Sequence, residues 1–238
     1  MLLITRPKPK LAASVAAFES AGLAVVGIAP FDIQPQNEVR EKLQETLSQR
    51  ANKRLLIATS KFAADALVDC VRDVPCHTPV VAVGLTTKQA LANCFSHVIT
   101  PHTSDSEGIL ALAELEQVNC ESAIVIKGVG GRDLIETQLA ERGIQVIVFN
   151  VYQRTKLNPV YSSAKWQWQD VTGIIATSGE MALALIEQYG FEQVKSKPWL
   201  TVSKRVATLL NQQGISAVQV CSGASDPLLI EWVKENWE

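Results

Sequence analysis

The chain has 238 residues, 47% of them hydrophobic and 19% charged, a composition typical of a globular protein with one large or two small domains. A formal net charge of −2 lacks the basic surplus that marks nucleic-acid-binding proteins. The sequence has no apolar run of about 18 residues, so we expect no membrane span, and the short apolar start at Leu2–Ile4 predicts no signal peptide.

The spacing of cysteine and histidine predicts neither a disulfide framework nor a metal centre. The five cysteines are an odd number without a C-x-x-C pair, so we expect reduced, buried thiols in a cytoplasmic protein. The three histidines lack the spacing of metal ligands, and His97, in an alternating segment, is expected to be an ordinary strand residue. The residues concerned are Cys70, Cys76, Cys94, Cys120, Cys221, His77, His97 and His102.

Short apolar runs alternate with helical patterns through the first half of the chain. Gly22 is expected to end the first helix as its C′ residue. Ser104 and Glu107 have the spacing of a capping box ahead of the last helix of this half. The expected strands cover 2–4, 23–29, 31–35, 54–58, 79–83 and 98–100, and the expected helices cover 11–21, 39–50, 61–72, 88–94 and 108–117.

The same alternation restarts in the second half. A half-exposed segment at 150–155 parallels the one at 31–36. The expected elements are strands at 123–126, 144–149, 200–203 and 218–221, helices at 133–142 and 227–236, and a strand–turn–helix element at 174–185.

One stretch of eleven residues, Ile57–Leu67, recurs 118 residues later as Ile175–Leu185, with seven positions identical. Each copy is typical of a strand, a tight turn and a helix, with a serine at the N-cap position. A helix N-terminus has spare N–H donors that suit an anion, although the two turns could equally serve only as caps. The candidate binding residues are Thr59, Ser60, Thr177 and Ser178.

The whole chain therefore reads as a tandem duplication with a period near 120 residues. Alternating strands and helices predict an α/β protein whose parallel sheets carry helices on both faces. Ligands of such sheets bind beyond the carboxyl ends of the strands. If the two copies face each other, we expect one cleft lined by the loops at 5–7, 59–61, 84–87, 127–132, 177–179 and 203–205.

The glycine-rich segment Lys127–Asp133 follows a strand and opens a helix, as a dinucleotide-binding fingerprint does. Its sixth position is Asp133 instead of glycine or alanine, and the next strand ends in Asn150 instead of an acidic residue, which disfavours that interpretation. The loop could wrap an anion with its N–H groups, helped by the charges of Lys127 and Arg132. The alternative is a helix entry that merely needs glycine.

The sequence offers few groups for acid, base or nucleophilic chemistry. It contains no G-x-S-x-G, H-E-x-x-H or Walker A motif. This set fits an enzyme that positions a reactive substrate and stabilises its charge. Tyr152 is the one phenol at a connection between the copies, and its alternative role is cross-strand packing. Arg205 follows Ser203 at a helix start, where it could clamp a carboxylate.

Taken in order, motifs along the entire chain resemble the uroporphyrinogen-III synthase family of the bacterial type. The motifs are Ile4–Pro7, the two Ala-Thr-Ser turns, Val83–Thr87, Lys127–Arg132 with Leu134 and Leu139, Tyr152–Arg154, Val202–Ala207 and Ala224–Asp226.

The resemblance implies two flavodoxin-like parallel-sheet domains joined by a two-stranded antiparallel β-ladder. One domain would combine residues 1–34 with 157–238, and the other would span 38–150. The ladder would pair 31–37 with 150–156. The sequence repeats would then not coincide with the domains.

The resemblance also implies a reaction: closure of hydroxymethylbilane, a linear tetrapyrrole, to uroporphyrinogen III in heme biosynthesis, with inversion of the last ring and loss of water. It implies no cofactor and no metal. Tyr152 would assist departure of the hydroxyl group. The implied substrate-binding residues are Thr5, Arg6, Thr59, Ser60, Gly84, Thr87, Lys127, Gly128, Gly130, Arg132, Thr177, Ser178, Ser203 and Arg205.

The expected partner is the linear tetrapyrrole, with the enzyme that supplies it as an open second partner, and we expect a monomer. A competing interpretation is a two-lobed module that binds an anionic ligand without catalysis. A different two-lobed transferase would need a nucleotide-binding loop, which the sequence lacks.

Overall fold

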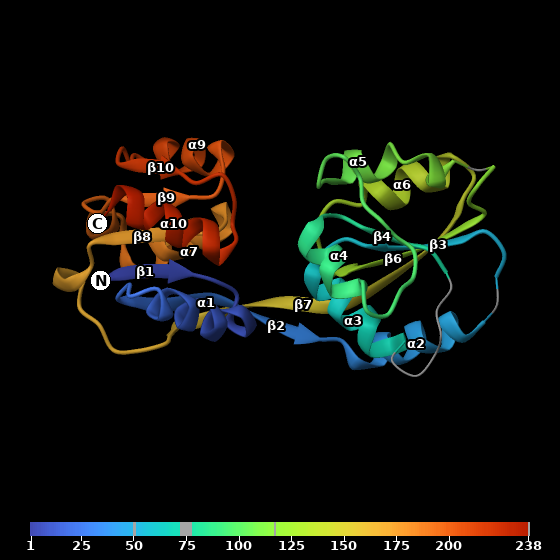
Figure 1. The fold of residues 1–238 in the computed structure, drawn as a ribbon, viewed down its shortest axis with the longest axis horizontal. Helices are drawn as coiled ribbons and strands as arrows, with labels where there is room; N and C mark the ends of the chain where they lie inside the picture. Colours follow the sequence, from blue (N-terminus) through green and yellow to red (C-terminus); the bar gives the residue numbers. More distant parts are fainter. Residues whose placement is uncertain (50, 72–77, 117, 238) are drawn as a thin grey trace. The chain divides into compact units, whose positions relative to one another are not determined.

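The computed structural model describes residues 1–49, 51–71, 78–116 and 118–237, and it shows alternating strands and helices (Figure 1). Cys76 and His77 lie outside the described residues, as do the expected helix ends at Arg50, Arg72 and Gln117. None of the helices within these ranges is long and apolar enough to cross a membrane.

The chain divides into two compact units. Unit 1 consists of Met1–Ile33 and Thr155–Glu238, and unit 2 consists of Gln34–Arg154. The units cut across the sequence repeats, because unit 1 joins the first strand of the first copy to the Thr-Ser element of the second copy, and unit 2 does the reverse.

Unit 1 contains a parallel sheet in the order β10, β9, β8, β1, β2. Its strands are β1 (Leu2–Thr5), β2 (Val25–Pro35), β8 (Gly173–Ala176), β9 (Trp199–Thr201) and β10 (Val218–Val220). Its helices are α1 (Lys8–Ser20), α7 (Gly179–Tyr189), α8 (Phe191–Val194), α9 (Lys204–Gln212) and α10 (Asp226–Asn236), with a 3₁₀ turn, η2, at Trp168–Asp170.

Unit 2 contains a parallel sheet in the order β7, β6, β3, β4, β5. Its strands are β3 (Arg54–Ala58), β4 (Val80–Ala82), β5 (Val98–Ile99), β6 (Ser122–Gly128) and the first part of β7 (Gln145–Ser162), which continues into unit 1. Its helices are α2 (Asn37–Ser48), α3 (Lys61–Val71), α4 (Leu85–Leu91), α5 (Ser106–Leu110) and α6 (Leu134–Glu141), with a 3₁₀ turn, η1, at Ala113–Leu115.

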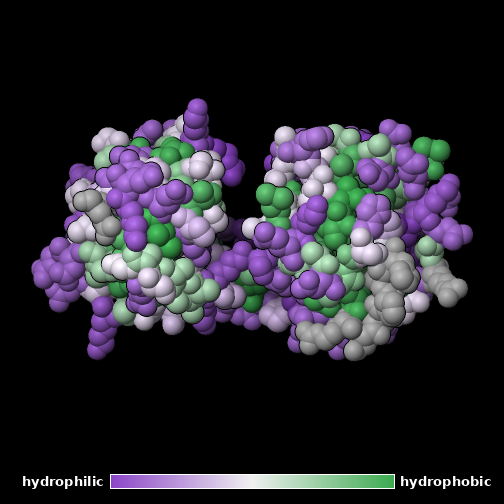
Figure 2. Space-filling model, in the orientation of Figure 1, coloured by the Kyte–Doolittle hydropathy of each residue, from purple (hydrophilic) through white to green (hydrophobic). Residues whose placement is uncertain are grey.

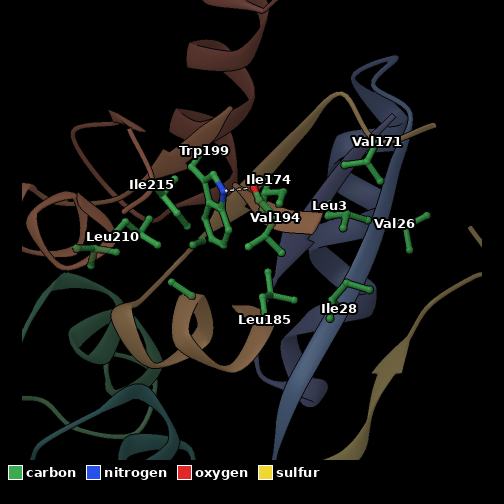
Figure 3. Close-up of a cluster of buried hydrophobic side chains, with 13 residues drawn as sticks. Leu3, Val26, Ile28, Val171, Ile174, Leu185, Val194, Trp199, Leu210 and Ile215 are labelled. Carbon is green, nitrogen blue, oxygen red and sulfur yellow. Dashed lines mark hydrogen bonds between the residues drawn. The ribbon is translucent and has the colours of Figure 1, made fainter. Parts of the chain in front are cut away.

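Helices cover both faces of the unit 1 sheet at its centre, which explains why the fully buried strands β1 and β8 are almost entirely apolar. Leu3 belongs to a core cluster with α7 and α9, whereas its neighbours Leu2 and Ile4 belong to a second cluster with α1 and α10. Trp199 is fully buried in the first cluster, and its indole Nε1 donates to the Val194 carbonyl at 3.0 Å (Figure 3). On the visible face of each unit, hydrophilic residues alternate with hydrophobic ones (Figure 2).

Several boundaries differ from the sequence predictions. Helix α1 begins at Lys8 because Pro9 lies in the first turn, where its missing N–H needs no partner. The capping box at Ser104 and Glu107 was wrong, since the Asp105 carboxylate caps α5 by accepting from Gly108 N at 2.7 Å. That helix ends at Leu110 and is followed by η1.

Other strand predictions also need correction. The segments 23–29 and 31–35 form a single strand, β2, and β7 likewise joins 144–149 to 150–155. His97 is exposed and lies one residue before β5.

Of the described cysteines, Cys70, Cys120 and Cys221 are buried and Cys94 is half-buried. Burial raises the pKa of the Cys70 and Cys120 thiols, so both stay protonated at neutral pH.

Candidate functional site

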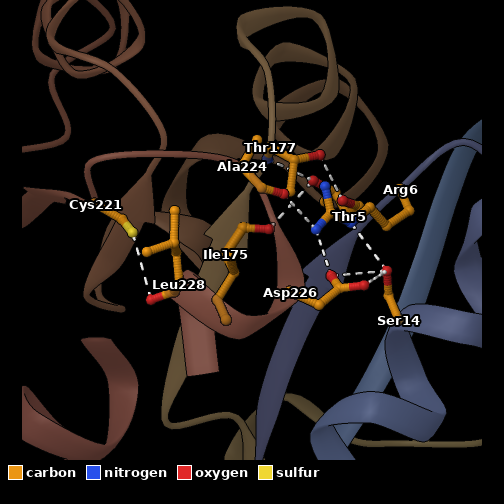
Figure 4. Close-up of polar contacts among 9 residues, drawn as sticks. All are labelled: Thr5, Arg6, Ser14, Ile175, Thr177, Cys221, Ala224, Asp226 and Leu228. Carbon is orange, nitrogen blue, oxygen red and sulfur yellow. Dashed lines mark hydrogen bonds and ion pairs between the residues drawn. The ribbon is translucent and has the colours of Figure 1, made fainter. Parts of the chain in front are cut away.

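The threonines of both Ala-Thr-Ser turns tie one strand end to its neighbour. Thr59 Oγ1 donates to the Ile126 carbonyl of β6 at 3.3 Å, and Thr177 Oγ1 donates to the Thr5 carbonyl of β1 at 2.7 Å. Thr5 Oγ1 donates to the Ile175 carbonyl at 3.2 Å and accepts from Thr177 N at 3.2 Å (Figure 4). The hydroxyls of these three threonines are therefore engaged in holding the carboxyl edge of each sheet.

The serines that follow these strand ends cap helices. Ser60 Oγ accepts from Ala63 N at 3.1 Å and Ser178 Oγ accepts from Met181 N at 3.2 Å. Ser203 Oγ accepts from Val206 N at 3.4 Å. Each cap satisfies one N–H of a first turn, while the two N–H groups before it have no acceptor within the helix. The starts of α3, α7 and α9 thus remain suited to carboxylates.

Tyr152 meets the first of these caps at the carboxyl edge of unit 2. The residue is only 5% exposed, and its hydroxyl oxygen lies 3.1 Å from Ser60 Oγ. The ring centroid lies 5.6 Å from that of Phe62, the second residue of α3. The structure therefore brings the predicted tyrosine and the first Thr-Ser turn into contact.

Gly128 completes this group because a side chain would not fit there. A Cβ built on Gly128 would lie 2.5 Å from Cε2 and Cζ of Tyr152. The pairing of β6 with β7 shifts between Lys127 and Gly128, so that Gly128 is opposite Tyr152, and Val129 N donates to the Tyr152 carbonyl at 2.8 Å. Such an irregularity re-aims a side chain. The ring packs directly against the glycine backbone.

The Lys127 ammonium forms its hydrogen bonds with the residues that follow it in the chain. Its Nζ donates to Glu136 Oε1 at 2.7 Å, Asp133 Oδ1 at 3.0 Å and the Arg132 carbonyl at 3.2 Å. Burial opposes the charge, but the hydrogen bonds and charges of Glu136 and Asp133 outweigh it and hold the pKa of Lys127 above 10.5. The ammonium thus braces the glycine-rich loop against α6.

The tip of that loop is open to solvent. Gly130 and Gly131 have φ values of +81° and +95°, and no atom lies within 4 Å of a Cβ built on either. Arg132 has a 75% exposed side chain, which pairs with Glu107 at 3.3 Å. In the glycine-rich segment, the residues at 130–131 and the Arg132 guanidinium are therefore accessible to a ligand.

Arg6 has an internal role that its sequence position did not predict. The residue is 8% exposed, and its guanidinium donates to Asp226, to Ser14 Oγ at 3.0 Å and to the Ala224 carbonyl at 2.7 Å (Figure 4). Ser14 Oγ also donates to Asp226. This network joins the end of β1 to the start of α10, so the charge of Arg6 is neutralised within unit 1.

The remaining predicted residues differ in accessibility. Gly84 caps α4, and a Cβ built on it would lie 2.9 Å from Ser104 Oγ. Helix α4 starts three residues before the predicted Lys88, so Thr87 lies in its first turn, and it is only 2% exposed there. Arg205, in contrast, is exposed at the start of α9.

Sequence reasoning missed the partners that fix these side chains. Asp226 lies 220 residues from Arg6, and no local pattern links the two. Glu136 carried a weak signal, as an acidic residue in the first turn of the helix after Lys127.

No three His, Cys, Asp or Glu side chains of the described part of the chain are grouped as metal ligands would be.

Comparison with known proteins gives matches along the entire chain. The sequence model described as uroporphyrinogen-III synthase HemD matches residues 12–231. The uroporphyrinogen-III synthase of Escherichia coli strain K12 is 29% identical over 243 residues, covering 96% of this chain and 98% of that protein. The Salmonella typhimurium LT2 enzyme is 27% identical, with coverage of 96% and 98%.

Two solved structures share the fold. A mutant uroporphyrinogen III synthase of the extremely thermophilic bacterium Thermus thermophilus gives a TM-score of 0.59 at 15% identity, and uroporphyrinogen-III synthetase of Helicobacter pylori 26695 gives 0.58 at 14%. Both matches cover 98% of each chain. They confirm the prediction of an α/β fold with a mostly parallel sheet. Since the family's sequence model spans residues 12–231, the chain belongs to the uroporphyrinogen-III synthase family.

Proposed function

We propose that this chain closes hydroxymethylbilane to uroporphyrinogen III, with inversion of the last pyrrole ring. The C–O bond of the terminal hydroxymethyl group breaks and a pyrrole N–H proton is lost, so that water leaves and an azafulvene remains. The substituted carbon of the last ring attacks the azafulvene methylene, and the resulting spiro intermediate rearranges to the type III macrocycle. Family membership over nearly the whole chain supports this reaction.

We propose that each unit is a flavodoxin-like domain and that residues 31–37 and 150–156 form an antiparallel ladder between them. β2 and β7 are neighbours in the strand order, and each contains residues of both units. Within unit 2, Gln36 N donates to the Val151 carbonyl at 3.0 Å. Within unit 1, Ser163 N donates to the Gly27 carbonyl at 2.9 Å. Residue numbers fall along β7 as they rise along β2, which supports the ladder.

The single observation that carries the proposed site is the contact of 3.1 Å between the Tyr152 hydroxyl and Ser60 Oγ. It places a phenol beside the start of α3, at the strand edge where parallel sheets bind ligands. Tyr152 is the proposed catalytic residue, which donates a hydrogen bond to the departing hydroxyl group. Because the substrate supplies the reactive atoms, this protein group needs only to orient and stabilise.

The carboxylates of the substrate are bound by exposed main-chain N–H groups and by two arginines. The N–H groups belong to the turns at Ser60, Ser178 and Ser203 and to the loop at Gly130, and the arginines are Arg132 and Arg205. Several N–H groups at helix starts attract carboxylates without a large positive charge. This explains how a chain with a net charge of −2 can bind a polyanion.

The other predicted residues act on the shape of the site. Thr5, Thr59 and Thr177 hold strand ends together, and Arg6 and Lys127 brace the loops that follow β1 and β6. Gly84 and Gly128 leave room for Ser104 and Tyr152, and Thr87 packs in α4. The expectation that loops of both copies line one cleft stays a prediction.

The isomer composition of the product tests the function. The purified protein is mixed with freshly prepared hydroxymethylbilane, the products are oxidised to porphyrins, and the type I and type III isomers are separated. We expect mainly type III, whereas spontaneous closure gives type I. Binding of the substrate with only type I product would instead indicate the module without catalysis. Addition of the enzyme that supplies hydroxymethylbilane tests that second partner, and sedimentation tests the expected monomer.

A further inference from the structure

Ser60 differs from its counterpart in the other Ala-Thr-Ser turn. Both Ser60 and Ser178 accept a cap hydrogen bond from the third residue of their helix, at 3.1 and 3.2 Å. Ser60 has in addition the hydroxyl of Tyr152 at 3.1 Å. Over the described ranges, Ser178 Oγ has no hydrogen bond besides its cap. The extra contact is therefore specific to unit 2 and is not needed for capping.

The cap restricts where the Ser60 proton can point. A serine hydroxyl has one proton and two lone pairs, and one lone pair of Ser60 already accepts from Ala63 N. The positive end of α3 attracts lone pairs and repels the hydroxyl proton, so the proton turns away from the helix axis. The Tyr152 hydroxyl oxygen, 3.1 Å from Ser60 Oγ, lies within hydrogen-bond distance of that proton.

The direction of this bond decides what Tyr152 can do. A phenol has one proton, so a Tyr152 that donates to Ser60 has none left for another acceptor. A Tyr152 that accepts from Ser60 keeps its own proton for the substrate. Gly128 packs on the ring and Phe62 lies 5.6 Å away, which limits other orientations of the ring.

We propose that Ser60 is a positioning residue that donates its hydrogen bond to Tyr152 and so aims the phenol proton at the departing hydroxyl group of the substrate. The proposal rests on the proposed function and deepens it. No proton leaves Ser60 or Tyr152: the phenol only donates a hydrogen bond, while the substrate's own hydroxyl and N–H proton leave as water. The Ser178 hydroxyl thus only caps its helix, whereas the Ser60 hydroxyl caps its helix and positions Tyr152.

A double-mutant cycle tests this coupling. Ser60→Ala should lower kcat about tenfold, the size expected for one lost hydrogen bond, with KM changed by no more than about twofold. In a Tyr152→Phe background the same change should have no further effect on kcat beyond about twofold, because the group it orients is gone. Ser60→Thr keeps the hydroxyl and should restore kcat to within about threefold of the wild type.

A matched control separates this effect from loss of a helix cap. Asp105 caps α5 in the same unit by accepting from Gly108 N, and its side chain bonds to Thr103 and Gly108 rather than to Ser60 or Tyr152 in the described structure. Asp105→Ala should therefore cost about 1 kcal/mol of stability, as cap losses do, without lowering kcat. A kcat that falls equally in Asp105→Ala and Ser60→Ala would attribute the loss to capping and overturn the proposal.

Tyrosine NMR supplies a readout that does not depend on turnover. The chain has three tyrosines, so a ¹³C-tyrosine-labelled sample gives three Cζ resonances, and Tyr152→Phe assigns the one of interest. Ser60→Ala should shift the Tyr152 resonance, whereas Asp105→Ala should not. An unmoved resonance, or an equal loss of kcat in the Tyr152→Phe background, overturns this proposal alone. A wild-type protein that makes only the type I isomer overturns the proposed function together with it.

Discussion

The sharpest test of the site is the substitution Gly128→Ala, because it adds a single methyl group against Tyr152. The new Cβ would lie 2.5 Å from Cε2 and Cζ of the ring, whereas carbon atoms prefer a separation of about 3.5–4.0 Å. The ring must therefore shift by about 1 Å or more. The Tyr152 main chain cannot follow easily, since its carbonyl accepts from Val129 N. The contact between Tyr152 and Ser60 is then broken.

The magnitude follows from three opposing terms. Overpacking in a tight core costs about 1–3 kcal/mol, and the lost hydrogen bond adds about 1 kcal/mol. A gain of about 0.4–1 kcal/mol offsets part of this, because alanine restricts the unfolded chain at a glycine whose φ is not positive. We expect unit 2 to lose about 1–3 kcal/mol and kcat to fall about tenfold or more.

Urea unfolding can measure this effect unit by unit. All five tryptophans lie in unit 1, so tryptophan fluorescence follows unit 1 while circular dichroism follows both units. Gly128→Ala should shift the dichroism transition to lower urea more than the fluorescence transition. If the variant keeps wild-type stability and wild-type isomer yield, the argument from packing at Gly128 is refuted.

Two controls isolate the steric cause. Gly130→Ala meets no atom within 4 Å but adopts φ +81°, so its cost, about 1–2 kcal/mol, is conformational and independent of Tyr152. In a Tyr152→Ala background, Gly128→Ala should become neutral or stabilising, because the ring it collides with is absent. Additive effects of the two substitutions would contradict the steric explanation.

Three further predictions address single side chains. Tyr152→Phe should lower kcat about 10- to 100-fold in the isomer assay, since positioning is shared with other groups, and should cost about 1 kcal/mol or less in urea. Asp226→Ala should destabilise unit 1 by about 3–5 kcal/mol by tryptophan fluorescence, because it leaves the Arg6 charge buried and unpaired; the milder Asp226→Asn keeps an acceptor and should cost less. The raised pKa of Lys127 contributes stability that is fully present below pH 10.5 and is lost as pH rises through its folded pKa, so a Lys127→Met variant should lack that loss when both proteins are unfolded in urea from about pH 9 to about pH 11.5.

The local features of the fold were predictable because their causes are local. Apolar runs placed nearly every strand, and the serines at 60 and 178 were identified as caps from side-chain chemistry alone, whereas Ser203, which caps α9, was expected to end a strand. The predicted helix boundary was wrong where either of two neighbouring residues could cap the helix, as with Ser104 and Asp105 at the start of α5. The first helix was expected to start at residue 11 instead of Lys8, because a proline is tolerated only in the first turn of a helix and the sequence does not show which turn Pro9 occupies.

The long-range features were not predictable from patterns. The ion pair of Arg6 with Asp226 joins residues 220 apart, and the packing of Tyr152 on Gly128 depends on an irregularity between β6 and β7. The charge of Lys127 pointed to a ligand, whereas the structure gives it two acceptors in its own loop and a third, Glu136, in α6. A basic residue at a strand end thus indicates that acceptors or negative charges lie nearby. It does not indicate whether they belong to a ligand or to the protein itself.

The two Ala-Thr-Ser turns show where function separates from architecture in a duplicated chain. In both units the threonine ties neighbouring strands and the serine caps the helix, so identity between the copies is explained by folding alone. The two copies differ in the residue that contacts the serine hydroxyl. Among the described residues, only Ser60 of the first turn has a tyrosine hydroxyl, that of Tyr152, within hydrogen-bond distance. A residue repeated for structural reasons is therefore a poor guide to the site by itself. The contact that breaks the repeat, between Ser60 and Tyr152, is the better one.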